Sequence, residues 1–164
     1  MKIKLSKGRP ASDEVILALE AALGHRLSDS FRDFLRTQDG AKPELNIFKV
    51  SDNNESRVNR FIPANEILSE RADIEMFPKK KHQYPVAWLE CGNYAFIDED
   101  RNGSVLFWDH ESPEEIVELA PSFGAFLDLL EPFDIKTVTL KPGQVVKRVW
   151  IDPAFLERLK KNKS

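Results

Sequence analysis

Three short apolar runs near the middle of the chain constrain its fold most strongly. They are Val86–Leu89, Tyr94–Ile97 and Val105–Trp108, and each is rich in the β-branched or aromatic residues that pack well on a pleated surface. Gly92-Asn93 separates the first two runs, and residues 100–103 (Asp-Arg-Asn-Gly) separate the last two. Runs of this length, bounded by Gly, Asn and Asp, predict an antiparallel β-meander. Because an isolated meander is unstable in water, helices must cover at least one of its faces.

The segments on either side of the meander supply those helices. A first helix, capped by Ser12 or Asp13 and ended by Gly24, is predicted by an apolar stripe at helical spacing: Val15, Ile16, Leu19, Ala22 and Leu23. A second helix is expected from Ser28 to Gly40, with a buried face made of Phe31, Phe34 and Leu35. A third begins after Ser122 and has four apolar residues on one side: Phe123, Phe126, Leu127 and Leu130. Asn65–Arg71 is expected to be a further short helix.

The remaining segments complete an α+β fold. Strands are expected at Leu45–Val50 and Arg57–Ile62, whereas Glu114–Leu119 is ambiguous between helix and strand. Residues 74–85 are predicted to be the least ordered part of the body. A hairpin from residue 135 to 151 and a final helix from Asp152 follow. The fold class is therefore a single α+β domain with a largely antiparallel sheet covered by helices.

The length and the residue totals favour one domain with a core of its own. A chain of 164 residues needs no disulfide to bury a core, and Cys91 is the single cysteine. Residues 1–11 are interpreted as a basic leader with little order of its own, to which Ile3 and Leu5 could add an edge strand. Residues 12–131 form the expected domain. Residues 132–164 are expected to be a hairpin and helix extension packed on that domain.

Charge and hydropathy limit the possible partners. The longest apolar run, Val15–Leu19, has five residues, which is too short for a membrane span or a signal-peptide core, so we expect a cytoplasmic protein with no membrane partner. The net charge is −3, but eight Lys and Arg residues lie within residues 1–9 and 158–163, which leaves the rest of the chain near −11. An acidic body binds nucleic acid poorly and favours a basic protein partner.

Three sequence signatures in order resemble the SUKH superfamily, the Smi–Knr type of domain, over about residues 12–131. The first is a Leu-Gly helix end followed by an aromatic helix: Leu23-Gly24, Leu27-Ser28, Phe31, Phe34-Leu35 and Asp39-Gly40. The second is a hairpin signature: Gly92, Asn93, Tyr94, Asp98, Gly103, Val105, Trp108, Asp109 and His110. The third is Ser122, Phe123, Phe126 and Leu127. Ser28 replaces a usual Pro, and Ala41 a common Gly. Residues after 132 depart from the minimal family domain.

The resemblance implies binding and no shared catalytic residues. Bacterial members resemble immunity proteins that bind and block a toxin, often a nuclease, whereas fungal relatives resemble regulators of cell-wall assembly. We therefore expect a non-enzymatic protein without a cofactor that neutralises a basic toxin by stoichiometric occlusion. The alternatives are a regulatory scaffold domain that binds a host protein and, more weakly, a calcium or small-ligand module.

An acidic cluster is the expected docking surface for such a toxin. Between Asp98 and Glu118 the local charge balance is −7, and only Arg101 opposes the acids. Acidic inhibitors gain association rate against electropositive nuclease sites, although the same residues also suit a solvated rim of an edge strand. The predicted partner-binding residues are Asp98, Glu99, Asp100, Asp109, His110, Glu111, Glu114 and Glu115.

Other chemistry is less well supported by the sequence. Asp98, Asp100, Asn102, Gly103 and Asp109 follow the spacing of a calcium loop, but strands flank them where that loop requires helices. With a single Cys, the histidines His25, His82 and His110 give no zinc spacing, and no nucleophile motif accompanies them. The tryptophans are expected in the core, or as interface anchors: Trp88, Trp108 and Trp150.

Overall fold

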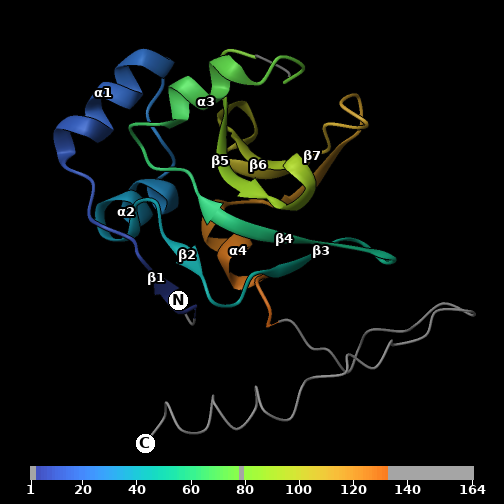
Figure 1. Cartoon of the computed structure of the whole chain (residues 1–164). Coiled ribbons are helices and arrows are strands. Elements are labelled where there is room, and N and C mark those ends of the chain that lie inside the picture. Colours follow the sequence, from blue (N-terminus) through green and yellow to red (C-terminus); the bar gives the residue numbers. More distant parts are fainter. Residues whose placement is uncertain (1–2, 78–79, 133–164) are drawn as a thin grey trace, which may run out of the picture. The chain divides into compact units, whose positions relative to one another are not determined.

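A six-stranded antiparallel sheet organises the computed structural model, which describes residues 3–77 and 80–132 (Figure 1). Each strand pairs with its neighbours in chain order. The strands are β3 (Ile47–Ser51), β4 (Asn54–Phe61), β5 (Gln83–Leu89), β6 (Tyr94–Asp98), β7 (Ser104–Trp108) and β8 (Ile116–Ala120). The predicted meander is confirmed as β5, β6 and β7, at the centre of the sheet. The predicted hairpin and helix between residues 135 and 164 lie outside the described residues.

Side chains alternate between the two faces of the meander, as the period of a strand requires. On β6, Ala95 and Ile97 join the main core, whereas Phe96 faces a second apolar cluster. On β7, Val105 and Phe107 join the main core, and Leu106 and Trp108 join the second cluster. Both faces of the sheet are therefore covered, which explains why residues 95–97 and 105–108 are apolar at successive positions.

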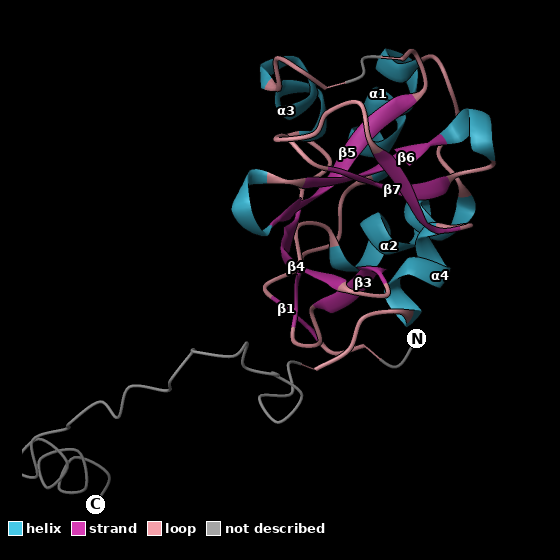
Figure 2. Cartoon of the chain, turned by 90° about the vertical axis from the view of Figure 1, so that its right-hand side faces the viewer, coloured by secondary structure: helices cyan, strands magenta, loops and turns pink. Residues whose placement is uncertain are grey.

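Three helices cover the main-core face: α1 (Asp13–Leu23), α2 (Asp29–Gln38) and α4 (Phe123–Asp128). The hydroxyls of Ser12 and Ser122 accept hydrogen bonds from backbone N–H groups at 3.4 and 3.1 Å and so cap α1 and α4. α2 and α4 lie side by side (Figure 2), and the ring of Phe123 lies 4.8 Å from that of Phe31 and 4.9 Å from that of Phe34. The helices predicted from apolar periodicity are thus confirmed.

The loop after α3 (Ile67–Asp73) covers the other face through Ile74 and Phe77, whereas Ile67 of α3 packs in the main core. Phe77 from this loop packs against Phe96 at a ring distance of 5.0 Å and against Trp108 at 5.8 Å. The loop was expected to be the least ordered part of the body, but its aromatic anchor is buried. β5 also begins earlier than predicted, at Gln83. Pro85 is tolerated there because β4 bonds to β5 only from Val86 onward.

The N-terminal segment is more ordered than its polar composition suggests. β1 (Leu5–Ser6) pairs with β2 (Lys42–Pro43) in a separate two-stranded sheet. The N–H of Arg9 donates to Asp39 at 3.0 Å, and that of Ala11 donates to Leu35 at 2.8 Å. The edge strand that Leu5 could add is present as β1, and the backbone bonds of Arg9 and Ala11 make residues 3–11 more ordered than the expected leader.

The segment that was ambiguous between helix and strand is the edge strand β8. Ile116 lies opposite Trp108, and Val117 lies opposite Phe107. Pairing with β7 satisfies backbone groups that a short isolated helix would leave exposed, and Pro121 prevents extension toward α4. Ile116 and Val117 remain partly exposed on this strand, which is the last in the strand order of the sheet.

Candidate partner-binding site at the acidic end of the sheet

The β6–β7 hairpin divides the predicted acidic cluster into two groups. Asp98 pairs with Ser104 at one end of the hairpin, and Tyr94 pairs with Trp108 at the other. Five-residue strands at about 3.3 Å per residue separate these ends by about 13 Å. Residues 98–100 thus lie at one end, and residues 109–115 follow the other. The eight predicted residues therefore do not form one continuous surface.

Asp98 and Glu99 are buried and bonded within the protein. Asp98 accepts from Gln83 Nε2 at 2.7 Å, and Arg101 lies 3.5 Å from the same carboxylate. Asp98 is only 3% exposed, so it cannot contact a partner. We therefore assign Asp98 a structural role in place of the predicted docking role, because its oxygens accept hydrogen bonds from donors of the meander.

Glu99 links the meander to the start of α2. Its carboxylate accepts from the hydroxyl of Tyr84 and, at 3.1 Å, from the backbone N–H of Ser28. Burial, reinforced by the charge of Glu99, raises the pKa of Tyr84 well above its ordinary value. Gly103, whose φ of +77° suits glycine, lies close to Ser28 and Glu99, and a side chain there would collide with Ser28. Glu99 is therefore also a structural residue and not the docking residue that the sequence analysis predicted.

Asp100 belongs to a histidine cluster that sequence spacing could not reveal. The carboxylate of Asp100 can only accept, so Nδ1 of His82 donates to it, at 2.7 Å. This hydrogen bond lowers the pKa of the Asp100 carboxyl. The ring of His25 lies 4.8 Å from that of His82. Two of the three histidines therefore meet, although no group of His, Cys, Asp or Glu among the described residues is arranged to hold a metal ion.

The other end of the hairpin carries an acidic hollow of about 220 Å³, here called the hairpin hollow. The β3–β4 hairpin, the β5–β6 turn and the β7–β8 loop build it. Its lining contains four carboxylates, of Glu55, Glu90, Asp109 and Glu111, together with His110 and Cys91. Glu114 and Glu115 are exposed just before β8 begins. This end gathers five members of the predicted set, Asp109, His110, Glu111, Glu114 and Glu115, with two acids that the sequence analysis did not select, Glu55 and Glu90.

Local hydrogen bonds fix the loop that presents these acids. The backbone N–H and the ring Nδ1–H of His110 both donate to Asn93 Oδ1, at 3.2 and 2.9 Å. The N–H of Glu111 donates to Asp109 at 2.9 Å. Gly92 faces the His110 ring with φ at +81°, a conformation that favours glycine. The β5–β6 turn and the β7–β8 loop are thereby held against one another.

A second hollow of about 440 Å³ adjoins the first, and His110 lines both. We call it the α3 hollow because α3 and the loop after it form one wall. Three carboxylates line it, those of Glu70, Asp73 and Glu75, with Ile74, Met76, Gly92, Tyr94 and Trp108. Glu70 Oε2 accepts from Trp88 Nε1 at 2.9 Å and from the hydroxyl of Tyr94 at 3.0 Å. Burial, followed by the hydrogen bond to Glu70, raises the pKa of Tyr94 to about 12.

The two hollows together present seven carboxylates, and neither lining contains Lys or Arg. Around them, Arg57 lies 3.8 Å from Glu90, and Lys49 stands opposite Glu55 in the β3–β4 pairing. We call this surface the acidic end. An anionic surface with aromatic walls attracts cationic groups, which suits binding to a basic partner.

The sequence of the chain matches the SMI1/KNR4 family (SUKH-1) over residues 10–129. The protein belongs to this family. The match spans α1 to α4 and every strand of the six-stranded sheet, whereas β1 precedes it. A search of curated proteins returned no match. Within the described part of this SUKH-1 chain, no helix is long and apolar enough to cross a membrane.

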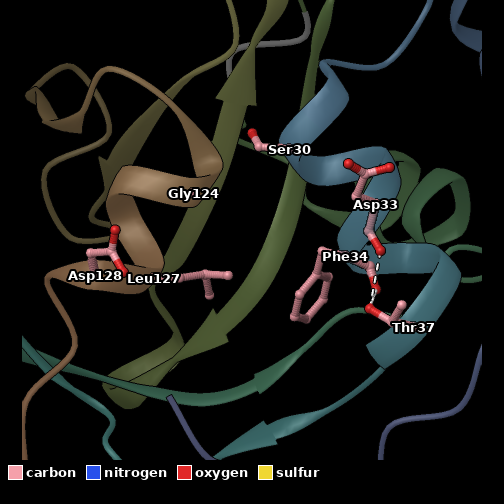
Figure 3. A pocket seen from close by; sticks show the side chains of 7 residues that line it. All are labelled: Ser30, Asp33, Phe34, Thr37, Gly124, Leu127 and Asp128. Atoms are coloured by element: carbon pink, nitrogen blue, oxygen red, sulfur yellow. Dashed lines mark hydrogen bonds between the residues drawn. The ribbon is translucent and has the colours of Figure 1, made fainter. Parts of the chain in front are cut away.

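A third concavity of this SUKH-1 domain lies between α2 and α4 (Figure 3) and measures about 350 Å³. Phe34 and Leu127 supply its apolar surface, and Asp33 and Asp128 lie on the two helices that flank it (Figure 3). The hydroxyl of Thr37 is already satisfied, since it donates to the backbone oxygens of Asp33 and Phe34 at 3.0 and 3.3 Å. This groove is less charged than the acidic end, since its lining contains two carboxylates.

Proposed function

We propose that this SUKH-1 protein is an immunity protein that binds a basic toxin stoichiometrically and occludes its active site or substrate surface. The single observation that carries the proposal is the acidic end, where seven carboxylates line two adjoining hollows without a Lys or Arg in either lining. Proteins of the SUKH-1 family are often immunity proteins, which agrees with a binding role. The docking residues are those of the predicted set at this end: Asp109, His110, Glu111, Glu114 and Glu115.

Electrostatics explains why an acidic surface suits this task. A nuclease must attract phosphate, so the region around its active site is electropositive. Complementary charge raises the association rate and disfavours wrong partners. The charges of the acidic end are largely free of basic neighbours within the described residues, so most of their field remains available to steer a partner.

The direct test pairs the chain with a toxin encoded beside its gene. We expect co-expression of the chain to protect cells from that toxin, and the purified proteins to form a 1:1 complex that blocks the toxin's activity. If no neighbouring toxin is neutralised, the proposal is contradicted and the regulatory-scaffold alternative is favoured.

Charge reversal then tests the surface. Glu111→Lys combined with Glu114→Lys, both at exposed positions, should slow association with the toxin by about tenfold at low salt and flatten its salt dependence. The matched control is Asp100→Lys at the opposite end of the hairpin, which lies beyond the screening length of about 8 Å at physiological salt. An equal loss in both variants, or a loss in the control alone, would contradict docking at the acidic end.

A further inference from the structure

The α3 hollow has an excess of negative charge that the described residues do not pair with basic side chains. Among residues 3–77 and 80–132, no basic side chain forms an ion pair with Glu70, Asp73 or Glu75. Asp73 and Glu75 are exposed, and the charge of Asp73 reaches the hydroxyl of Tyr94, whose pKa it helps to raise. Asp73 and Glu75 therefore line the same hollow as Glu70.

Two aromatic side chains, those of Tyr94 and Trp108, also line this hollow. Trp108 is 2% exposed, and the half-buried ring of Tyr94 lies 6.1 Å from it at an angle of 49°. Glu70 fixes the orientation of Tyr94 through the hydroxyl. Met76 also lines the hollow and is 61% exposed, and its flexible thioether side chain can adapt to the shape of a ligand. A cation bound in this hollow lies near the carboxylates of Glu70, Asp73 and Glu75 and near an aromatic ring.

An independent observation concerns the indole of Trp108. Its Nε1–H is buried and has no hydrogen-bond partner among the described residues. Buried donors in folded proteins are nearly always paired, and Trp108 lines the α3 hollow, so we expect the occupant of the hollow to bring an acceptor to this indole. A ligand suited to this site therefore brings a cationic group and a hydrogen-bond acceptor together.

We propose that the α3 hollow receives an arginine residue of the protein partner, an inference that rests on the proposed function and specifies the chemistry of its contact. The guanidinium group binds the carboxylates of Glu70, Asp73 and Glu75, and a main-chain carbonyl beside it accepts from Trp108. Arginine is favoured over lysine because its planar guanidinium stacks on aromatic rings and binds carboxylates through two parallel hydrogen bonds.

The probe for this site is a blocked arginine, N-acetyl-arginine N-methylamide, titrated into the full chain. The readout is the NMR shift of the indole N–H signals of Trp88 and Trp108. We expect saturable shifts of both signals, with the blocked lysine analogue binding more weakly. The neutral isostere, blocked citrulline, should cause no saturable shift. Choline is a further control, because its cationic group has no hydrogen-bond donor. If blocked citrulline or choline binds as tightly as blocked arginine, the inference is overturned.

Matched substitutions tie the shifts to the hollow. Asp73→Asn combined with Glu75→Gln changes two exposed side chains that make no hydrogen bonds to the described residues, so the fold should be retained. Loss of two partly solvated charges should weaken probe binding about threefold to tenfold. Asp128→Asn, in the groove between α2 and α4, should leave it unchanged. Undiminished binding in the double variant would overturn the inference.

The two proposals fail separately. A chain that neutralises its toxin but gives no saturable shift with blocked arginine overturns the arginine site alone. A chain that binds the probe but protects against no neighbouring toxin supports the cationic site and contradicts the immunity function. Because the probe titration requires no toxin, neither result depends on the other.

Discussion

Glu70 is the residue on which the geometry of the α3 hollow depends, because one of its oxygens serves two aromatic donors on different strands. Trp88 Nε1 and the hydroxyl of Tyr94 reach Oε2 at 2.9 and 3.0 Å. Both donors are polar ends of amphipathic rings, which usually find a partner when buried. A carboxylate at this position therefore holds β5 and β6 at a fixed distance from α3 while its charge remains at the hollow.

The titration of Tyr94 provides a residue-scale prediction. Its pKa of about 12 in the folded protein exceeds the ordinary value near 10, so its hydrogen bond stabilises the fold fully below pH 10 and is lost as pH rises from 10 to 12. Glu70→Gln should lower the pKa of Tyr94 while leaving it above 10, because burial is the larger cause. Phenolate absorbance measures this, with Tyr94→Phe as the control. An unchanged titration in Glu70→Gln would contradict the role of Glu70.

At the scale of elements, the sequence signals that succeeded were local. Apolar runs with Gly and Asn between them predicted the meander, and periodicity with Ser caps predicted α1, α2 and α4. The acidic cluster is not a single surface because residues of one short stretch of sequence, such as Asp98 and Asp109, lie at opposite ends of a hairpin. The distance between these residues depends on the turn and on the pairing register of the strands. A count of charged residues along the sequence gives no information on either.

The hollows could not be predicted for a related reason. The α3 hollow joins α3 to β6 and β7, and the hairpin hollow adds Glu55 from the β3–β4 hairpin. These residues become neighbours only through tertiary packing. The strand β8 was ambiguous because pairing with β7, rather than its own propensity, decides its conformation.

The connection between the meander and α2 gives an element-scale prediction. Glu99→Ala leaves the Tyr84 hydroxyl and the Ser28 N–H without their acceptor, so the free energy of unfolding should fall by about 2–5 kcal/mol. Asp100→Ala, one residue away but exposed, should change the free energy of unfolding much less. Urea unfolding of both variants measures the difference. Equal losses would mean that Glu99 does not join the two elements.

At the scale of the whole molecule, the sheet separates two apolar clusters with different tasks. The main core on the helical face centres on Phe123, whose ring contacts Phe31, Phe34, Phe61 and Phe126. The second cluster on the opposite face consists of Phe77, Phe96, Leu106 and Trp108 and supports the α3 hollow. The domain thus has its larger core on one face and the cluster that supports the α3 hollow on the other.

This division predicts different outcomes for two large-to-small substitutions. Phe123→Ala should lower the free energy of unfolding by about 3–5 kcal/mol, because it opens a cavity among four aromatic rings. Phe77→Ala removes ring contacts to Phe96 and Trp108 in the smaller, second cluster, so the fold should survive while the loop after α3 loosens. Hydrogen exchange should then increase in α3 and its loop and remain slow in α1 and α2. If Phe77→Ala speeds exchange equally on both faces, the two clusters act as one core, and the binding surface cannot be altered without loosening the fold.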